Sequence, residues 1–225
     1  MIIQPGGGRF KIEEKQNFVS WMDFEFFIRT PSDTGLALHD IKFEGDSILY
    51  ELRLQETYVT YASDNPKHGG RDFLDSGFLM RLNMVELVPG HDCPPYATFL
   101  WANHNVQDQT VTRRNGICIF EYTADHALQR HTSTDQVSIG RNTYMVVRWV
   151  STVGNYDYTF DYVFTSTEQE KLKFEQVVSS SASCGTKTAL KTNMVIECMM
   201  RPQQACTTMF LTSKRTLTSQ ALPTE

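Results

Sequence analysis

The sequence predicts an all-β domain of the antiparallel sandwich class, followed by an irregular C-terminal tail. Short runs rich in Val, Ile, Thr and aromatic residues recur up to residue 164, and turn-forming residues separate them. No helices alternate with these runs, and many strands without helices between them are typical of antiparallel sheets packed face to face. We therefore expect a β domain over residues 1–164 and an atypical tail over residues 165–225.

The expected strands follow one another along the domain. They cover residues 18–28, 41–54, 97–106, 116–123, 143–153 and 156–164. Turn formers separate them at Pro31-Ser32-Asp33, Asp64-Asn65-Pro66, His68-Gly69-Gly70 and Asn115-Gly116. The last run alternates most clearly, because side chains point to opposite faces of a strand in turn. Its first face carries Tyr156, Tyr158, Phe160, Tyr162 and Phe164, and its second carries Asp157, Thr159, Asp161 and Val163.

Composition excludes two classes of partner. The chain has 225 residues, of which 40% are hydrophobic, enough to bury a sizeable core. Its net charge of −5 argues against a nucleic-acid binder, which needs clustered Lys and Arg to neutralise phosphates. No apolar run reaches the roughly 20 residues that span a bilayer, so we expect no membrane span. The first residues lack the apolar region of a signal peptide, and the compartment stays unknown.

The residues alone predict no metal site. The six histidines are His39, His68, His91, His104, His126 and His131. All six precede Tyr156, and His126 and His131 are five apart, which puts them on opposite faces of a strand. None of the five cysteines forms a Cys-x-x-Cys pair. Surface or hydrogen-bonded core histidines are therefore the simpler interpretation.

Two short stretches are candidates for a functional site. "DFLDSG" places Asp75 beside a Ser-Gly turn, where a carboxylate can be held near a pocket. "VGNYDY" places Gly154 and Asn155, which tolerate unusual backbone angles, directly before an aromatic strand. This predicts a bend or bulge that presents Tyr156 at the end of a strand. On these residues alone, a turn aspartate and a core tyrosine remain the simpler interpretation.

An ordered series of blocks resembles the catalytic domain of the copper amine oxidases, which oxidise primary amines with a topaquinone cofactor. The blocks include "RFKIEEKQNFVSWMDFEFFI", "FLDSG", "ELVPGHDCPPYATFL", "NGICIFEYT" and "RNTYMVVRWVSTVGNYDY", and they cover residues 9 to about 164. The last block resembles the family signature T-x-x-N-Y-[DE]-Y. The resemblance implies part of the family's large antiparallel β-sandwich, a homodimer, and conversion of a primary amine and dioxygen to aldehyde, ammonia and hydrogen peroxide.

The resemblance also implies roles for individual residues. Tyr156 matches the tyrosine that becomes topaquinone and forms a Schiff base with the substrate. Asp75, 81 residues earlier (156 − 75), matches the base that accepts the α-proton. Such a base works best in a buried, apolar setting that raises its pKa. The other implied positions are cofactor-binding Tyr61, Asn155 and Asp157, the substrate-channel residue Phe73, and the disulfide pair Cys93 and Cys118.

The implied cofactors are copper and topaquinone, but the copper ligands of the family are not matched. The family binds copper through a His-x-His pair after the cofactor tyrosine and a third histidine further on. No histidine follows Tyr156 in this chain. We therefore expect no metal ligands here, no assembly of either cofactor, and no activity of the chain as written. The alternative is a non-catalytic β-sandwich module for binding or structure.

The tail suggests how the ligands were lost. When the last base of each codon is read with the first two of the next, some junctions can encode only one amino acid. In this reading, Gly replaces Met194-Val195, Arg replaces Ile196-Glu197, Asp replaces Met199-Met200, and Val replaces Met209-Phe210. One permitted reading contains His-Asp-His from codons that begin at Cys206, 50 residues after Tyr156 (206 − 156). We interpret residues 165–225 as an out-of-frame translation, with a genuine disordered tail as the alternative.

Overall fold

The structure, a computed structural model, describes residues 7–33, 35–54, 56–61, 71–154 and 156–165. It describes the backbone alone for residues 59–61 and 71–72 within these ranges, and for 171–180, 192–199 and 210–212 beyond them. These residues form β-strands and one single-turn 3-10 helix, η1 (Asp75–Phe78). No α-helix occurs among them, nor any helix long and apolar enough to cross a membrane. The all-β prediction is confirmed.

The N-terminal strands form an antiparallel meander. They are β1 (Lys11–Glu13), β2 (Phe18–Trp21), β3 (Phe24–Arg29), β4 (Ala37–Phe43) and β5 (Asp46–Arg53), in the spatial order β1-β2-β3-β4-β5. Two of the expected runs, 18–28 and 41–54, each contain a tight turn and therefore supply parts of two strands. The turns include Met22 and Glu44, both with φ of 53°. Met22 is not a usual turn residue, but Gly45, which follows Glu44 with φ of 88°, is one, so only the second reversal had a signal in the sequence.

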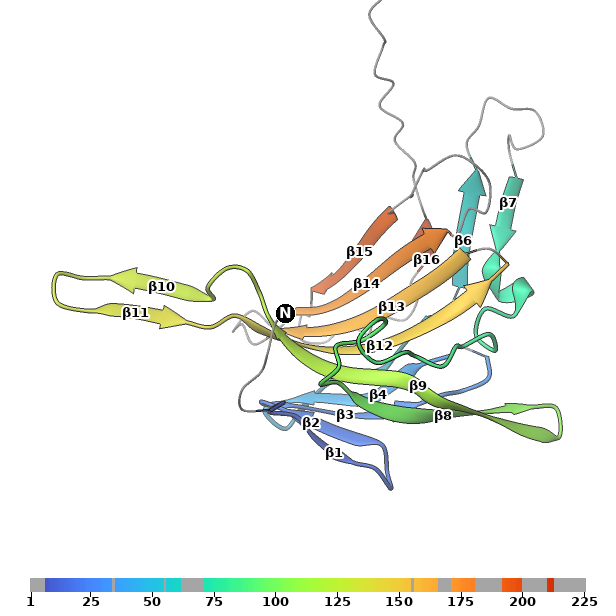
Figure 1. Cartoon of the computed structure of the whole chain (residues 1–225), viewed down its shortest axis with the longest axis horizontal. Coiled ribbons are helices and arrows are strands. Elements are labelled where there is room, and N and C mark those ends of the chain that lie inside the picture. The colour runs from blue at the N-terminus through green and yellow to red at the C-terminus, as the bar shows by residue number, and fades with distance from the viewer. Residues whose placement is uncertain are drawn as a thin grey trace, which may run out of the picture.

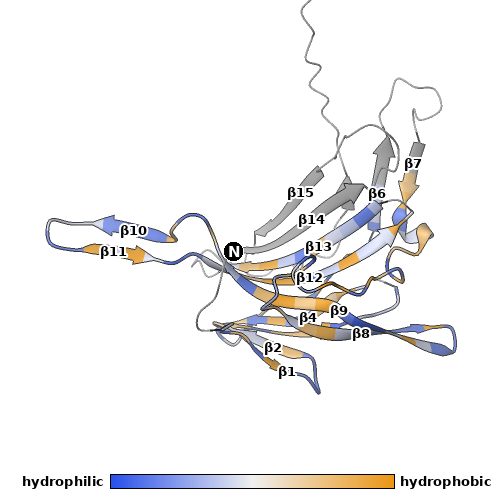
Figure 2. Ribbon diagram, in the orientation of Figure 1, coloured by the Kyte–Doolittle hydropathy of each residue, from blue (hydrophilic) through white to orange (hydrophobic). Residues whose placement is uncertain are grey.

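A larger antiparallel sheet lies across the first one (Figure 1). Its spatial order is β15-β14-β13-β12-β9-β8. The bounds are β8 (Thr98–Val106), β9 (Gln109–Thr123), β12 (Thr143–Val153), β13 (Tyr156–Thr165), β14 (Lys171–Ser180) and β15 (Thr192–Met199). In Figure 2, hydrophobic residues lie along β9 and β12, while the far end of the β8–β9 hairpin is hydrophilic. The hydrophobic part of these strands is therefore the part that is buried, whereas the hairpin end is largely exposed.

Aromatic side chains fill the space between the two sheets. The Phe26 ring of β3 stacks on the Phe164 ring of β13, with centroids 4.6 Å apart. Trp149 and Phe160 stack at 4.4 Å, and the buried Tyr162 hydroxyl donates to the Leu36 carbonyl at 3.0 Å. The predicted aromatic face of the 156–164 run is therefore the face that packs in the sandwich core.

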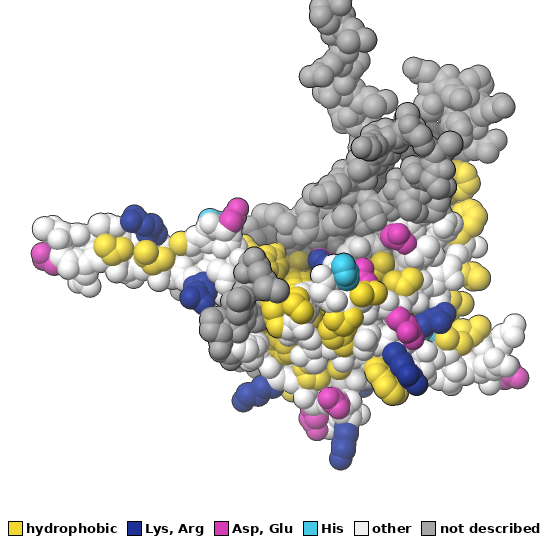
Figure 3. Space-filling view, in the orientation of Figure 1, with side chains coloured by type: hydrophobic (Ala, Val, Ile, Leu, Met, Phe, Trp, Pro, Cys, Tyr) yellow, Lys and Arg dark blue, Asp and Glu magenta, His cyan; other side chains and the backbone are white. Residues whose placement is uncertain are grey.

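The opposite face of the larger sheet carries a second apolar cluster. Its buried members are Leu87, Cys93, Cys118, Phe120, Val146, Val150 and Val163. Figure 3 shows hydrophobic side chains gathered over this part of the visible surface. Val163 belongs to this cluster while Phe164 belongs to the main core, which confirms the alternation predicted for the strand.

Smaller elements complete the fold. β6 (Glu56–Tyr61) pairs antiparallel with β7 (Arg71–Leu74) and parallel with β16 (Phe210–Thr212). β10 (Gln129–Thr132) and β11 (Val137–Gly140) form a hairpin that projects away from both sheets (Figure 1). β7 leads directly into η1, which brings this turn against the ends of β12 and β13.

Candidate active site

The turn after β7, residues 75–80, holds the predicted base. We call it the Asp75 turn. Asp75 is its first residue and is only 5% exposed. Leu79 has φ of 60°, in the left-handed region, and its amide donates to the Ser76 carbonyl at 3.1 Å. The chain therefore reverses tightly here.

The burial of Asp75 does not come chiefly from its neighbours in the sequence. Leu74 is 54% exposed and Phe78 is 51% exposed. The buried Tyr158 side chain of β13 instead lies against the Asp75 carboxyl and forms a hydrogen bond with it. Asp75 thus contacts a strand that lies far away in the sequence.

The end of β12 is hydrogen-bonded to the Asp75 turn and to the residues that follow it. The Ser151 hydroxyl donates to the Met80 carbonyl, and Met84 forms an isolated bridge with Ser151. The Val85 amide donates to the Val150 carbonyl at 3.0 Å. Because Ser151 pairs with Tyr158 across the β12–β13 ladder, the turn and the tyrosine are held at the same level of the sheet.

Tyr156 is the first residue of β13 and follows a hairpin turn. Val153, the last residue of β12, pairs with Tyr156, so only two residues connect the strands. The first of these, Gly154, has φ of +62°. Two-residue hairpin turns favour residues that accept positive φ. The predicted bend before Tyr156 is therefore a hairpin turn between two strands, and no bulge is needed. Asn155, the second turn residue, lies outside the described residues.

Tyr158 links the two main predicted residues. It is two positions from Tyr156 on the same face of β13, and the two ring centroids are 6.4 Å apart. The same Tyr158 side chain forms the hydrogen bond with Asp75. Asp75 and Tyr156 therefore both interact with the Tyr158 side chain, at one corner of the main core.

The structure does not bring all of the remaining predicted site residues to this corner. Phe73 is half-buried in β7 and its ring centroid is 6.0 Å from that of Phe78. Tyr61 pairs with Arg71 at the end of the β6–β7 ladder, where the backbone alone is described. Asp157 accepts a hydrogen bond from the Thr152 hydroxyl at 2.6 Å, on the opposite face of β13 from Tyr156.

Two carboxyl groups at this corner have pKa values shifted in opposite directions. Burial raises the pKa of Asp75; the hydrogen bond from Tyr158 opposes this, and the negative charge of Glu56 adds to it. Burial also raises the pKa of Glu56, but hydrogen bonds from Ser76 and Thr57 and the charge of Arg81 outweigh it, so its pKa is lowered. A carboxyl group with a raised pKa is suited to accept a proton.

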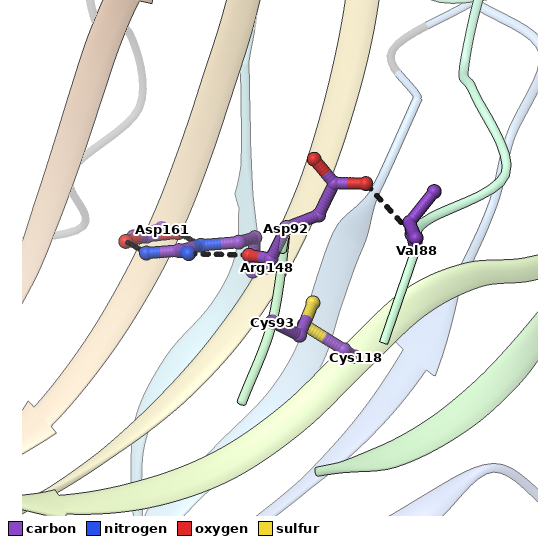
Figure 4. The surroundings of a disulfide bond; sticks show 6 residues. All are labelled: Val88, Asp92, Cys93, Cys118, Arg148 and Asp161. Atoms are coloured by element: carbon purple, nitrogen blue, oxygen red, sulfur yellow. Dashed lines mark hydrogen bonds and ion pairs between the residues drawn. A yellow bond between two sulfur atoms is a disulfide. The ribbon is translucent and has the colours of Figure 1, made fainter. Parts of the chain in front are cut away.

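The cysteine pair that the resemblance implied forms a disulfide. Cys93 and Cys118 join the loop before β8 to β9, and they are 25 positions apart in the sequence. Beside the bond, Arg148 donates from two nitrogens to Asp161 and from a third to the Asp92 carbonyl, each at 2.7 Å (Figure 4). These groups line an open groove of about 470 Å³ on the sheet face opposite Asp75 and Tyr156.

Comparison with known proteins decides the family. The family described as copper amine oxidase, enzyme domain, matches residues 11–179. The chain belongs to the copper amine oxidase family. It is 38% identical to the copper amine oxidase vicK1 of Bipolaris victoriae over 164 residues, which are 72% of this chain and 23% of that protein. It is 34% identical to the copper-containing diamine oxidase of Mus musculus, over 72% of this chain and 22% of that one.

Solved copper amine oxidase structures share the fold. The Aspergillus nidulans amine oxidase superposes with a TM-score of 0.73 at 38% identity, over 80% of this chain and 24% of its own. The Pichia pastoris lysyl oxidase gives 0.72 at 34% identity, with the same two coverages. The chain thus spans about a quarter of the length of the relatives it matches. Its sandwich is part of the large antiparallel sandwich of this family.

The described residues of this copper amine oxidase domain do not form a site that fits a copper ion. In the part of the chain that the structure describes, no three His, Cys, Asp or Glu side chains come together as metal ligands. Over the whole sequence, no histidine follows His131. Copper in proteins is held by imidazole, thiolate and thioether ligands in a defined geometry. No step of a reaction can be assigned to copper in this chain.

Two residues at this corner, Glu56 and Tyr158, were not predicted as site residues from the sequence. Tyr158 carried a usable signal, because it shares a strand face with Tyr156. Glu56 carried none, because it meets the Asp75 turn only through the pairing of β6 with β7, 20 residues later.

Proposed function

We propose that this chain carries the base and the cofactor tyrosine of a primary-amine oxidase, and that it does not complete the reaction as written. Membership of the copper amine oxidase family supports amine oxidation in general. The family reaction takes a primary amine, dioxygen and water to an aldehyde, ammonia and hydrogen peroxide. Here Asp75 is the group that accepts a proton from the substrate, and Tyr156 is the residue that matches the topaquinone precursor.

The observation that carries the proposal is the convergence of Asp75 and Tyr156 on Tyr158. These residues are 81 positions apart (156 − 75), and the fold places them at one corner of the core. A buried carboxyl with a raised pKa next to the candidate cofactor position suits proton abstraction from a bound amine. Phe73, at the mouth of the same turn, is proposed to line the channel for the substrate, with Tyr61, Asn155 and Asp157 flanking the quinone.

The histidines that bind copper in the family have no counterpart after Tyr156 in this chain. Conversion of Tyr156 to the quinone needs copper held by imidazole ligands, which this chain lacks after Tyr156. We therefore assign copper and topaquinone to the complete enzyme that contains these histidines. The alternative, a non-catalytic β-sandwich module, is favoured by the same absence of ligands among the described residues. The amine and dioxygen are the proposed small-molecule partners, and a homodimer is the proposed assembly of the complete enzyme.

Copper loading followed by redox staining for protein-bound quinone tests this proposal. The chain as written is compared with a variant in which the reading frame after Phe164 is shifted to encode His-Asp-His. We expect no stain from the first and a stain from the second. The stain should disappear when Tyr156→Phe is introduced into the shifted-frame variant. Absence of stain from the shifted-frame protein, although it binds copper, would favour the non-catalytic module.

A further inference from the structure

Glu56 fixes the Asp75 turn from the side of β6. Its Oε1 accepts the Ser76 amide at 3.0 Å and the Thr57 amide at 2.9 Å, and its Oε2 accepts the Ser76 hydroxyl. Hydrogen bonds to a charged carboxylate are shorter and stronger than those between neutral groups. The residue directly after Asp75 is therefore held by its backbone and its side chain at once.

Tyr158 meets the same turn from the side of β13. It is 4% exposed, and its side chain hydrogen-bonds to the Asp75 carboxyl. Its position along the strand is set by pairing with Ser151, whose hydroxyl is bonded to the Met80 carbonyl. Both ends of the turn are thus attached to strands: Ser76 to β6 and Met80 to β12.

We propose that Glu56 and Tyr158 are positioning residues that together hold the Asp75 carboxyl in one orientation beside Tyr156. Glu56 acts through Ser76 and sets the backbone of the turn, and Tyr158 acts on the carboxyl itself. This inference rests on the proposed function of Asp75 as the base. A base must be held within hydrogen-bond reach of the proton it removes, and a loosely held carboxylate loses much of its effect.

The charges around Asp75 make the two contributions separable. Glu56 on β6 is negative, and Tyr158 and Tyr156 on β13 are phenols. Arg81, just after the turn, interacts with Glu56. The Glu56 charge raises the pKa of Asp75, whereas the Tyr158 hydrogen bond lowers it. Removing each group should therefore move the pKa of Asp75 in opposite directions.

The test is an NMR titration of the chain labelled with ¹³C at the aspartate carboxyl groups, with Asp75→Asn identifying the signal. Glu56→Gln keeps an acceptor for Ser76 and removes the charge, so we expect the pKa of Asp75 to fall. Tyr158→Phe removes the hydrogen bond, so we expect it to rise. Matched controls on exposed positions, Glu25→Gln and Tyr50→Phe, should leave it unchanged.

A role confined to general stability gives a different result. Loosening of the turn would expose the carboxyl and move its pKa toward the ordinary value in both variants. Shifts in the same direction, or no shift in either variant, would overturn the proposal. The titration does not depend on copper or quinone, so its failure leaves the amine oxidase proposal intact, and the reverse also holds.

Amide exchange followed by mass spectrometry gives a second readout for the hydrogen bonds between Glu56 and Ser76. The Ser76 amide should exchange about tenfold faster in Glu56→Ala, which removes both acceptor oxygens. Glu56→Gln retains an acceptor and should show a smaller change. Where the Glu56 variants fail to fold, Ser76→Ala is the alternative, because it removes only the hydroxyl group. We expect this variant to fold and its Asp75 carboxyl group to be less ordered in the NMR spectrum. Unchanged exchange at Ser76 in a folded Glu56→Ala would contradict the role of Glu56.

Discussion

At the scale of single residues, burial of ionisable groups is the main feature of this domain. Asp75 is 5% exposed and His104 is 1% exposed. Burial is the largest cause of the pKa shift of each side chain. Charged forms of such groups are disfavoured by loss of hydration. The consequence for Asp75 is a carboxyl suited to proton transfer, and for His104 it is a dependence of stability on pH.

His104 should make the domain less stable in mild acid. Burial lowers the pKa of its ring; the neighbouring backbone of Thr30 opposes this and the charge of Arg113 adds to it. The unfolded chain therefore binds a proton on His104 at a higher pH than the folded domain does. Stability is fully present above the unfolded pKa of about 6.5 and is lost as the pH falls below it, down to the lowered folded pKa.

Urea unfolding at pH 7.5 and pH 5 measures this effect. We expect the midpoint to fall between these pH values by more in the unaltered chain than in His104→Gln. His131 is exposed, so His131→Gln is the matched control and should keep the full pH dependence. An equal pH dependence in the unaltered chain and in His104→Gln would show that the buried ring does not carry the effect.

At the scale of elements, the β12–β13 hairpin sets where Tyr156 begins. Its turn leaves two residues between paired Val153 and Tyr156, and Gly154 takes a positive φ of +62°. A side chain at such a position costs about 1–2 kcal/mol because Cβ approaches the following carbonyl. The hairpin thus depends on a residue that tolerates this conformation.

Gly154→Val should destabilise the domain by about 1–2 kcal/mol. Gly154→Asn should cost less, since Asn accepts the left-handed region more readily. Chemical denaturation of both variants against the unaltered chain provides the measurement. Equal stability of Gly154→Val and the unaltered chain would mean that the turn does not need its positive φ.

The Cys93–Cys118 disulfide should contribute about 3 kcal/mol, as expected for a bond that closes a loop of this length in the unfolded chain. Reduction of the chain should lower its unfolding midpoint accordingly. The double variant Cys93→Ser/Cys118→Ser should start at the lower midpoint and should not respond to reductant, which separates this bond from effects at the other cysteines. A midpoint that is the same before and after reduction contradicts a stabilising role.

At the scale of the whole molecule, periodicity predicted more of the fold than of the site. The alternation of residues 156–164 correctly placed the aromatic side chains toward one layer, because a strand has only two faces. The turn at Met22 was missed because Met does not favour a positive φ, whereas the turn at Glu44 was missed although Gly45, with φ of 88°, is a typical turn residue. Asp75 and Tyr156 were found through resemblance to a family, whereas Glu56 meets the Asp75 turn only after two distant strands have paired.

At the same scale, we propose that the last part of this copper amine oxidase chain is read in the wrong frame. The family match to residues 11–179 and the absence of histidine after His131 are the two observations that it has to reconcile. We propose that a frame change in the tail reconciles them, because one permitted shifted reading contains His-Asp-His from codons that begin at Cys206.

Sequencing the transcript from the codon of Phe164 to the stop tests this claim most directly. We expect the message, or a spliced form of it, to encode His-Asp-His about 50 codons after Tyr156 (206 − 156), followed by a further histidine. The matched control is the stretch that encodes residues 71–165, which should agree with the printed sequence. A message that encodes the tail as printed would contradict the claim and would leave a domain without copper ligands, with a role in binding.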